Sequence, residues 1–377
     1  MLVGHRTSDD PDVDTVHGSD ALRRLDRLAN IAGAATGLQY LYLPSSHRVW
    51  RHPWVADADV IQLYNTHGGY FSQWLIPALA SRAPLVWRMS DLWLMTGHCA
   101  YPGSCERWRI GCGACPDLGT YPGLKWDTTG FLWRHKQKLY ARSKMTIVAP
   151  SSWAGRMARE SPILGGFPVH QIPNGIDAAL FYPQDKIRLR QKLGIPVDAK
   201  VILFAAHILD DNPRKGGELL ISALAHVGAR PGVRLMLVGR GGSSWPSRVP
   251  IPVDCLGFIV GAELAAAYAA ADIFVAPSAV ENLPNTVLEA MAAGLPVVAS
   301  NAGGMADAVR HNETGLLFDV GDAGALAKNL ECLFDDADLQ ERLGQAARRV
   351  IKEEFSEEAE VQRFAELYVA LATPRTA

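Results

Sequence analysis

The sequence predicts an α/β protein made of two doubly wound domains, and three observations lead to that fold class. Short runs of β-branched and aromatic residues alternate with segments of helical periodicity through both halves of the chain. The 377 residues exceed what a single hydrophobic core usually supports. A Pro-Asn-Gly turn at residues 173–175 separates the two runs of alternation. Such alternation favours parallel sheets with helices on both faces.

The elements follow from the apolar pattern. In the first half, buried strands are predicted at residues 39–43, 60–64, 85–89 and 145–149, with a helix at residues 21–33. In the second half, strands at residues 201–206, 233–238, 272–276 and 297–300 alternate with helices at residues 218–226, 262–270 and 286–293. We expect an N-terminal domain over residues 1–178, a C-terminal domain over residues 179–354 and an amphipathic terminal helix over residues 355–377.

Composition agrees with a globular enzyme and excludes some partners. The chain is 48% hydrophobic and 20% charged, which is ordinary usage, and its net charge of −2 gives no electrostatic case for nucleic-acid binding. No window holds 18 uninterrupted apolar residues, and five aspartates among the first twenty residues are unlike a signal peptide. We therefore expect a cytosolic protein.

Two glutamates eight residues apart, Glu281 and Glu289, stand between two apolar strands in the segment 274–300. A loop at the carboxyl end of the first strand delivers Glu281, and a helix that opens after Pro284 carries Glu289. Open α/β sheets bind ligands at this end of their strands, and ionised carboxylates accept hydrogen bonds from sugar and ribose hydroxyls. Taken alone, two glutamates would more commonly be solvated, so the surrounding sequence decides.

The unit Glu281-x7-Glu289 resembles the signature of the retaining GT4 glycosyltransferases, which have the GT-B fold. The resemblance covers nearly all of residues 60–365. It implies two Rossmann-like domains that face a central cleft and a terminal helix that crosses back to the N-terminal domain. The other matching stretches, in the family's order, are Pro150-Ser151-Ser152-Trp153, the segment from Ile172 to Asp177, Arg214-Lys215-Gly216, the turn Val238 to Gly241, Gly303-Gly304 and Thr314-Gly315-Leu316.

The resemblance implies a nucleotide-diphosphate-sugar donor and assigns its contacts. Arg214 and Lys215 offer a planar fork and a mobile ammonium to the diphosphate, although an exposed basic pair is otherwise common. Glu289 would hold the ribose, and Glu281 the transferred sugar. The donor-binding residues are then Arg214, Lys215, Gly239, Glu281, Asn282, Leu283, Glu289, Gly303 and Gly304.

The stretch from Trp87 to Leu118 resembles a branch of the family that acts in bacterial exopolysaccharide synthesis, of the colanic-acid type. In that branch a His-Asp pair commonly stands where this chain has Ser90 and Asp91. Serine cannot carry a positive charge, so Asp91, His98 or a backbone group would take over the contact. His67 follows a predicted strand and should also face the cleft. The catalytic candidates are Asp91, His67 and Glu281.

Four of the six cysteines fall in an insertion at residues 98–118. Cys112 and Cys115 have the spacing of a metal knuckle, whereas Cys99 and Cys105 are unusually spaced for a zinc ribbon, and His98 is an additional ligand candidate. Two disulfides are improbable in a cytosolic chain. The alternatives are a structural zinc site and reduced thiols in a folded loop. No cofactor is expected for catalysis.

The beginning of the chain departs from the family. Members generally open with a buried strand and a glycine-rich loop, whereas Met1 to Gly4 resembles the family's second strand and leads into an acidic loop. We therefore expect the first domain to lack its opening β-α unit. We expect either that the start codon has been placed too late or that the protein is a shortened homologue.

These observations favour a glycosyltransferase that transfers a sugar with retention to a glycan or lipid-linked oligosaccharide in surface polysaccharide biosynthesis. We expect peripheral association with the inner face of the plasma membrane. The alternatives are a truncated, non-catalytic sugar-nucleotide-binding homologue and a nucleotide-sugar epimerase. The donor base, the sugar and the acceptor depend on hydroxyl placement that the sequence does not fix.

Overall fold

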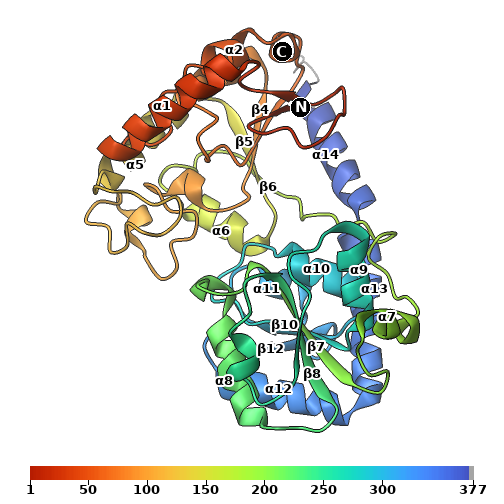
Figure 1. Cartoon of the computed structure of the whole chain (residues 1–377). Helices are drawn as coiled ribbons and strands as arrows, with labels where there is room; N and C mark the ends of the chain where they lie inside the picture. Colours follow the sequence, from red (N-terminus) through yellow and green to blue (C-terminus); the bar gives the residue numbers. More distant parts are fainter. Residues whose placement is uncertain (373–377) are drawn as a thin grey trace. The chain divides into compact units, whose positions relative to one another are not determined.

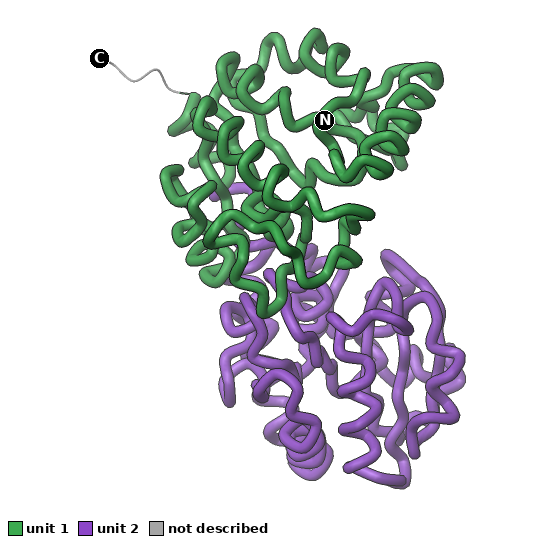
Figure 2. Tube along the Cα trace, turned by 90° about the vertical axis from the view of Figure 1, so that its left-hand side faces the viewer, with its two compact units in different colours: residues 1–172, 364–377 green, residues 173–363 purple. Residues whose placement is uncertain are grey.

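The computed structural model describes residues 1–372, which divide into two compact units. Unit 1 comprises residues 1–172 together with the C-terminal residues from Phe364, and unit 2 comprises residues 173–363 (Figure 2). The predicted boundary at residue 178 lies a few residues beyond the division at Ile172 and Pro173. Each unit has its own parallel sheet and its own core, and each is described by itself.

Unit 2 is built on a six-stranded parallel sheet with the order β12-β11-β10-β7-β8-β9 (Figure 1). The strands are β7 (Lys200–Ile208), β8 (Val233–Arg240), β9 (Val253–Cys255), β10 (Ile273–Ala276), β11 (Val297–Ser300) and β12 (Gly315–Phe318). The helices are α7 (Lys186–Leu193), α8 (Gly217–Val227), α9 (Gly261–Ala270), α10 (Asn285–Ala292), α11 (Met305–Ala308), α12 (Ala323–Asp335) and α13 (Ala337–Glu354), with 3-10 turns η3 (Pro213–Lys215) and η4 (Trp245–Ser247).

Alternate residues of β7 enter two different cores, as expected for a sheet covered on both faces. Leu203 packs in the core that contains α9, α10 and α13, whereas Phe204 packs in the core that contains α8 and α12. This arrangement confirms the doubly wound architecture predicted for the second half. Every strand and helix predicted there is present, with ends that differ by no more than a few residues.

Unit 1 contains a four-stranded parallel sheet with the order β3-β4-β5-β6. Its strands are β3 (Ile61–Tyr64), β4 (Leu85–Arg88), β5 (Met145–Ala149) and β6 (Val169–Gln171). Its helices are α1 (Asp20–Thr36), α2 (Ser46–Arg51), α3 (Pro53–Ala56), α4 (Leu75–Arg82), α5 (Thr129–Tyr140) and α6 (Ser152–Glu160), with 3-10 turns η1 (Trp93–Met95) and η2 (Arg107–Arg109).

The strand predicted at residues 39–43 is wrong. These residues form turns and an irregular segment, and Tyr40 adopts a left-handed φ of 58°, which no strand accommodates. Leu43 is nevertheless buried, with 1% exposure, and its backbone N–H donates to Ser72 Oγ at 2.5 Å. The apolar run is therefore only partly buried, since Tyr42 is 53% exposed, and it forms a loop instead of a strand.

The first residues of the chain do form a strand, but it lies outside the main sheet of unit 1. Strand β1 (Leu2–Val3) pairs in parallel with β2 (Asp14–Thr15) in a separate two-stranded sheet. The absence of an opening β-α unit and the placement of the start codon stay predictions.

The terminal helix α14 (Glu357–Ala372) contributes to both units. From Phe364 onward it belongs to unit 1, where Phe364 and Leu367 pack with Val86, Val148 and Ile172. The last residues of the predicted helix, 373–377, lie outside the described residues. None of the helices within residues 1–372 is both long enough and apolar enough to cross a membrane.

The close packing around Gly216 predicts a measurable loss of stability when a Cβ is added. Gly216 has φ +74° and a Cβ there would lie 1.9 Å from the Pro277 carbonyl oxygen, whereas Gly194 has φ +68° and open space. We expect Gly194→Ala to cost about 1 kcal/mol from the left-handed backbone alone. Gly216→Ala should cost at least about 2 kcal/mol because a clash adds to that strain. Chemical denaturation measures the free energy of unfolding of both variants. Equal losses would contradict the close packing around Gly216.

Candidate functional site

The site residues of unit 2 gather at the carboxyl edge of its sheet, where the strand order reverses. From β7 the chain proceeds outward to β8 and β9, and it then returns to β10 on the other side of β7. The loops that follow β7 and β10 therefore flank a topological switch point, which is where open α/β sheets bind ligands. Arg214 and Lys215 lie in the first of these loops and Glu281 in the second.

Glu281 holds the two basic residues. Its Oε2 accepts a hydrogen bond from Arg214 Nη1 at 3.0 Å, and its Oε1 accepts from Lys215 Nζ at 2.7 Å and from Ser278 Oγ at 2.9 Å. The Glu281 side chain is only 5% exposed, so these charge-assisted contacts compensate its burial. The sequence predicted Arg214, Lys215 and Glu281 as neighbours of a common ligand, and the structure brings their side chains into direct contact.

Glycines make this junction compact. A Cβ at Gly303, whose φ is +60°, would lie 2.0 Å from the Glu281 carbonyl oxygen, and the Gly304 N–H donates to that same oxygen at 2.9 Å. Only glycine fits at position 303, where the approach is this close. The loop after β11 is thereby fixed against the loop that carries Glu281. Gly303 and Gly304 are thus part of the cluster.

Gly239 has a different surrounding. Its φ is +146°, a Cβ there would lie 1.9 Å from the Ala206 carbonyl oxygen, and its N–H donates to the Gly257 carbonyl at 2.9 Å. Its backbone therefore allows β7 and β8 to approach each other. The predicted donor contact of Gly239 stays a prediction.

Glu289 lies on α10 and is largely buried. Tyr268, which is fully buried, donates its hydroxyl to Glu289 Oε2 at 2.8 Å. Burial raises the pKa of the Glu289 carboxyl, while the Tyr268 hydrogen bond and the charge of Lys215 act in the opposite direction. The sequence analysis missed Tyr268 and Ser278, because a single buried tyrosine or loop serine gives no pattern that distinguishes it from core packing.

Asn282 and Leu283 are both 4% exposed and lead from Glu281 into α10. The Leu283 carbonyl accepts a hydrogen bond from Asn174 Nδ2 at 3.1 Å, and the same amide donates to Asn285 Oδ1 at 2.8 Å. The Asn-Gly turn at the start of unit 2 therefore supports the backbone at Asn282 and Leu283, which were predicted to bind the donor. That contact itself stays a prediction.

In unit 1 the structure pairs two residues that were predicted separately. His67 follows β3 and Asp91 follows β4, so both lie at the carboxyl ends of neighbouring parallel strands. His67 Nε2 lies 2.6 Å from Asp91 Oδ2, and the residues are 5% and 7% exposed. Asp91 Oδ1 also accepts from the Trp93 backbone N–H at 2.9 Å.

The Asp91 carboxylate can only accept, so Nε2 of His67 donates to it, and Nδ1 is the ring nitrogen that can accept a hydrogen bond when the imidazole is neutral. Tyr121, which is 60% exposed, places its hydroxyl 3.4 Å from that Nδ1. We name His67, Asp91 and Tyr121 the His67 cluster. His98, one of the groups predicted to take over the contact of the missing histidine, contacts the Pro122 carbonyl and Cys115.

Three of the four cysteines of the insertion, Cys99, Cys112 and Cys115, lie in surroundings that disfavour the thiolate. Burial raises the pKa of Cys99 to about 12 and that of Cys112 to about 11, and it raises the pKa of Cys115. All six cysteines are free. Catalysis by a thiol therefore has no support here.

Comparison with known proteins agrees with the fold and with the cluster in unit 2. Residues 199–336 match the family described as Glycosyl transferases group 1. The chain is similar to D-inositol 3-phosphate glycosyltransferase of Corynebacterium efficiens. The two are 38% identical over 190 positions, which cover 46% of this chain and 44% of the relative. It is 33% identical over 222 positions, 58% of this chain and 55% of the relative, to a GDP-mannose-dependent alpha-mannosyltransferase of Mycolicibacterium smegmatis.

Solved structures show the same architecture. HepE of Anabaena, in complex with UDP and glucose, superposes with a TM-score of 0.68 at 22% identity over 96% of this chain and 86% of HepE. Sucrose-phosphate synthase of Thermosynechococcus elongatus gives a TM-score of 0.66 at 22% identity over 87% and 78% of the two chains. The fold is GT-B, and residues 199–336 match a group 1 glycosyltransferase domain. It spans about half the length of the curated relatives it matches.

The burial of Glu289 predicts a pH-dependent gain in stability when its charge is removed. Because burial raises its pKa, the ionised carboxylate destabilises the folded protein above that pKa, and the cost disappears as the pH falls through it. Glu289→Gln keeps an acceptor for Tyr268 and should stabilise the protein at pH 8, on the order of 1 kcal/mol. The gain should shrink toward pH 5. Thermal unfolding across this range measures it.

The exposed Glu353 of α13 provides the matched control, since Glu353→Gln makes the same chemical change without burial. A pH-independent effect of Glu289→Gln, equal to that of Glu353→Gln, would show that the carboxylate is not penalised by its surroundings.

Proposed function

We propose that the protein is a retaining glycosyltransferase that uses a nucleoside-diphosphate sugar as donor. The observation that carries this proposal is the cluster of Arg214, Lys215 and Glu281 at the switch point of unit 2, with Glu289 on the adjoining helix. The guanidinium of Arg214 and the ammonium of Lys215 suit a diphosphate. The carboxylates of Glu281 and Glu289 suit the hydroxyl-rich groups joined to it, because they accept hydrogen bonds. The names of the relatives, all glycosyltransferases, support the same class of reaction.

In this proposal the diphosphate competes with Glu281 for its two cations. Arg214 and Lys215 lie on one carboxylate in the structure. A bound diphosphate would attract both basic side chains, neutralise the charge that develops on the leaving group, and release carboxylate oxygens of Glu281 for the hydroxyls of the transferred sugar. Glu281 therefore holds the basic pair in place before the donor binds and contacts the sugar afterward.

Glu289 would bind the ribose. The Tyr268 hydroxyl occupies one of its carboxylate oxygens, so the ribose hydroxyls would bind the other. A buried carboxylate that costs stability is the kind of group that a protein retains for a ligand.

The His67 cluster supports a role in unit 1 on the acceptor side. A neutral imidazole held by a buried carboxylate offers a fixed Nδ1 acceptor, and the exposed Tyr121 provides a hydroxyl beside it. Such a cluster can orient an acceptor hydroxyl, while the leaving diphosphate accepts its proton in retaining transfer with departure and attack on one face. The cleft between the two domains stays a prediction of the GT-B resemblance.

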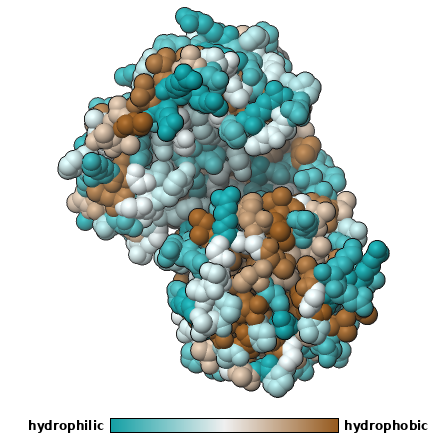
Figure 3. Space-filling view, in the orientation of Figure 1, coloured by the Kyte–Doolittle hydropathy of each residue, from teal (hydrophilic) through white to brown (hydrophobic). Residues whose placement is uncertain are grey.

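The acceptor class is part of the proposal. A glycan or lipid-linked oligosaccharide follows from the resemblance to surface-polysaccharide enzymes, while the relative named D-inositol 3-phosphate glycosyltransferase and the sulfoquinovosyl transferase SQD2 of Arabidopsis thaliana favour an inositol- or glycolipid-type acceptor. Peripheral membrane association has one supporting feature. Helix α1 exposes Leu25, Leu28 and Ile31 beside Arg24 and Arg27, and brown side chains gather over it in Figure 3.

A donor screen tests the proposal through Lys215. With a panel of nucleoside-diphosphate sugars, we expect one or more donors to release the nucleoside diphosphate. Lys215→Gln should weaken binding of that diphosphate about 10- to 100-fold, the loss expected for one charged contact of about 1.5–3 kcal/mol. Isothermal titration calorimetry measures the binding.

Lys192→Gln is the control, because Lys192 is exposed on α7 of the same unit and outside the cluster. Diphosphate binding without release from any donor or acceptor would favour the non-catalytic homologue. Interconversion of the donor sugar without transfer would favour the epimerase.

The His67 cluster predicts a selective defect in transfer. His67→Asn and Asp91→Asn should each lower transfer to the acceptor about 10-fold or more, since each removes a buried, charge-assisted hydrogen bond. Affinity for the nucleoside diphosphate should change little. His170→Asn, on the exposed strand β6, is the control. An equal loss of donor affinity and transfer in both variants would argue against an acceptor-side role.

A further inference from the structure

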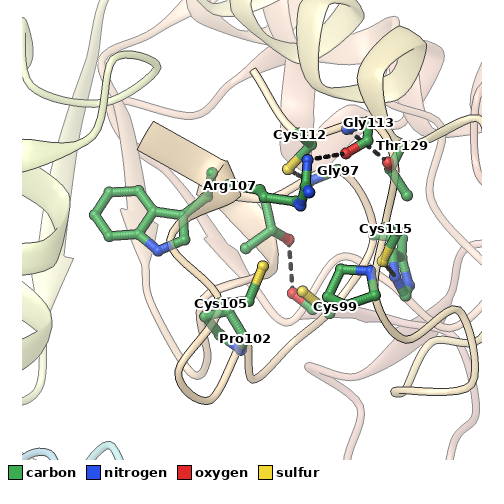
Figure 4. Close-up of a pocket in the computed structure, with 13 residues that line it drawn as sticks. Gly97, Cys99, Pro102, Cys105, Arg107, Cys112, Gly113, Cys115 and Thr129 are labelled. Atoms are coloured by element: carbon green, nitrogen blue, oxygen red, sulfur yellow. Dashed lines mark hydrogen bonds between the residues drawn. The ribbon is translucent and has the colours of Figure 1, made fainter. Parts of the chain in front are cut away.

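The insertion in unit 1 encloses a small cavity lined by soft ligands. Its volume is about 20 Å³, which is room for about one water-sized sphere. In Figure 4 the sulfur atoms of the four cysteines lie around this cavity, from separate parts of the loop. The lining groups able to bind a metal are His98, Cys99, Cys105, Cys112 and Cys115.

His98 has the orientation of a ligating imidazole. Its Nδ1 lies 2.9 Å from the Pro122 carbonyl oxygen, which can only accept, so Nδ1 carries the proton. The other ring nitrogen, Nε2, lies 3.4 Å from Cys115 Sγ, and the residue is 2% exposed. Metal-bound histidines characteristically donate their other ring N–H to a carbonyl in this manner.

The backbone from Cys112 to Cys115 forms a tight, strained turn. Cys112 and Ala114 have φ values of 55° and 45°, in the left-handed region that side chains rarely adopt. The Gly97 N–H donates to Cys112 Sγ at 3.2 Å, which links this turn to the residue beside His98. Strain of this kind persists where the surroundings impose it, frequently at a ligand site.

The loop that contains these residues has little structure of its own. From Thr96 to Thr128 the only helical element is η2, and no strand is present. Irregular segments of this length are uncommon in compact domains unless they are functional. The four cysteines are free, so no disulfide stabilises the loop.

We propose that four of these five side chains bind one zinc ion in the cavity. Thiolate and imidazole ligands select zinc, which is four-coordinate and tetrahedral in structural sites. Within residues 1–372, no three His, Cys, Asp or Glu side chains already converge as a metal site, so binding requires side-chain rotations that bring the sulfurs onto one point. Each ligating thiol loses its proton to solvent as the Zn–S bond forms.

The metal would act by bracing the loop that carries Tyr121. Tyr121 lies in the same irregular segment, next to Pro122, whose carbonyl holds His98. Its hydroxyl belongs to the His67 cluster. A zinc ion at the cavity would therefore fix one end of the segment that positions this hydroxyl, without contacting substrate. The zinc site itself does not depend on the proposed function.

The test is the zinc content of the full-length protein, purified without an affinity tag or a chelator. We expect one zinc per chain. A thiol reagent should then react rapidly with the exposed Cys255 and Cys332 and with at most one cysteine of the insertion, and with all six cysteines after the metal is removed by a chelator. Cobalt substitution should give sulfur-to-cobalt charge-transfer absorption.

Single variants identify the ligands. Among Cys99→Ser, Cys105→Ser, Cys112→Ser, Cys115→Ser and His98→Gln, four should lower the zinc content to background and one should retain it. Cys255→Ser and Cys332→Ser are the controls and should retain one zinc. Because a ligand variant can fail to fold, the thiol and zinc measurements on the unaltered protein decide first. Absence of stoichiometric zinc, or disulfides among the four cysteines by mass spectrometry, would overturn the proposal.

Discussion

The contact of Glu281 with Arg214 and Lys215 is the interaction on which the rest of unit 2 depends. It joins the loop after β7 to the loop after β10 at the point where the strand order of the sheet reverses. A buried carboxylate needs partners, and two cations need an anion, so each group satisfies the other while no ligand is bound. The glycines at positions 216 and 303 let the backbones approach closely enough for this contact to form. The same geometry suits a diphosphate, which can replace the carboxylate on both cations.

Unit 1 solves a comparable problem with a different pair. His67 and Asp91 are brought together because β3 and β4 are parallel neighbours whose carboxyl ends lie at one edge. Burial strengthens this hydrogen bond, and the Asp91 carboxylate determines which ring nitrogen points toward it. Each unit therefore presents a buried carboxylate that orients nitrogen-containing groups, two cations in unit 2 and an imidazole in unit 1. In the proposed function, the cluster of unit 2 binds the diphosphate donor and the His67 cluster orients the acceptor hydroxyl.

Periodicity predicted the parallel sheets well because buried strands in such sheets are continuous apolar runs, as in β5 and β10, where every residue is buried. It failed at residues 39–43, because apolarity reports burial and not the conformation of the backbone. The cluster of Arg214, Lys215 and Glu281 was predicted from sequence motifs and their order along the chain. Tyr268 and Ser278 were not predicted, since their roles come only from contact with Glu289 and Glu281.

The sequence by itself determined the alternation of strands and helices, the position of Glu281 at a strand end, and the proximity of Arg214 to Lys215, because these are local properties of spacing and composition. Only the tertiary structure decided that Glu281 holds both cations, that His67 pairs with Asp91, and that the four cysteines line one cavity. These pairings join residues far apart in the chain. Their geometry arises from sheet order and loop packing, which no local pattern encodes.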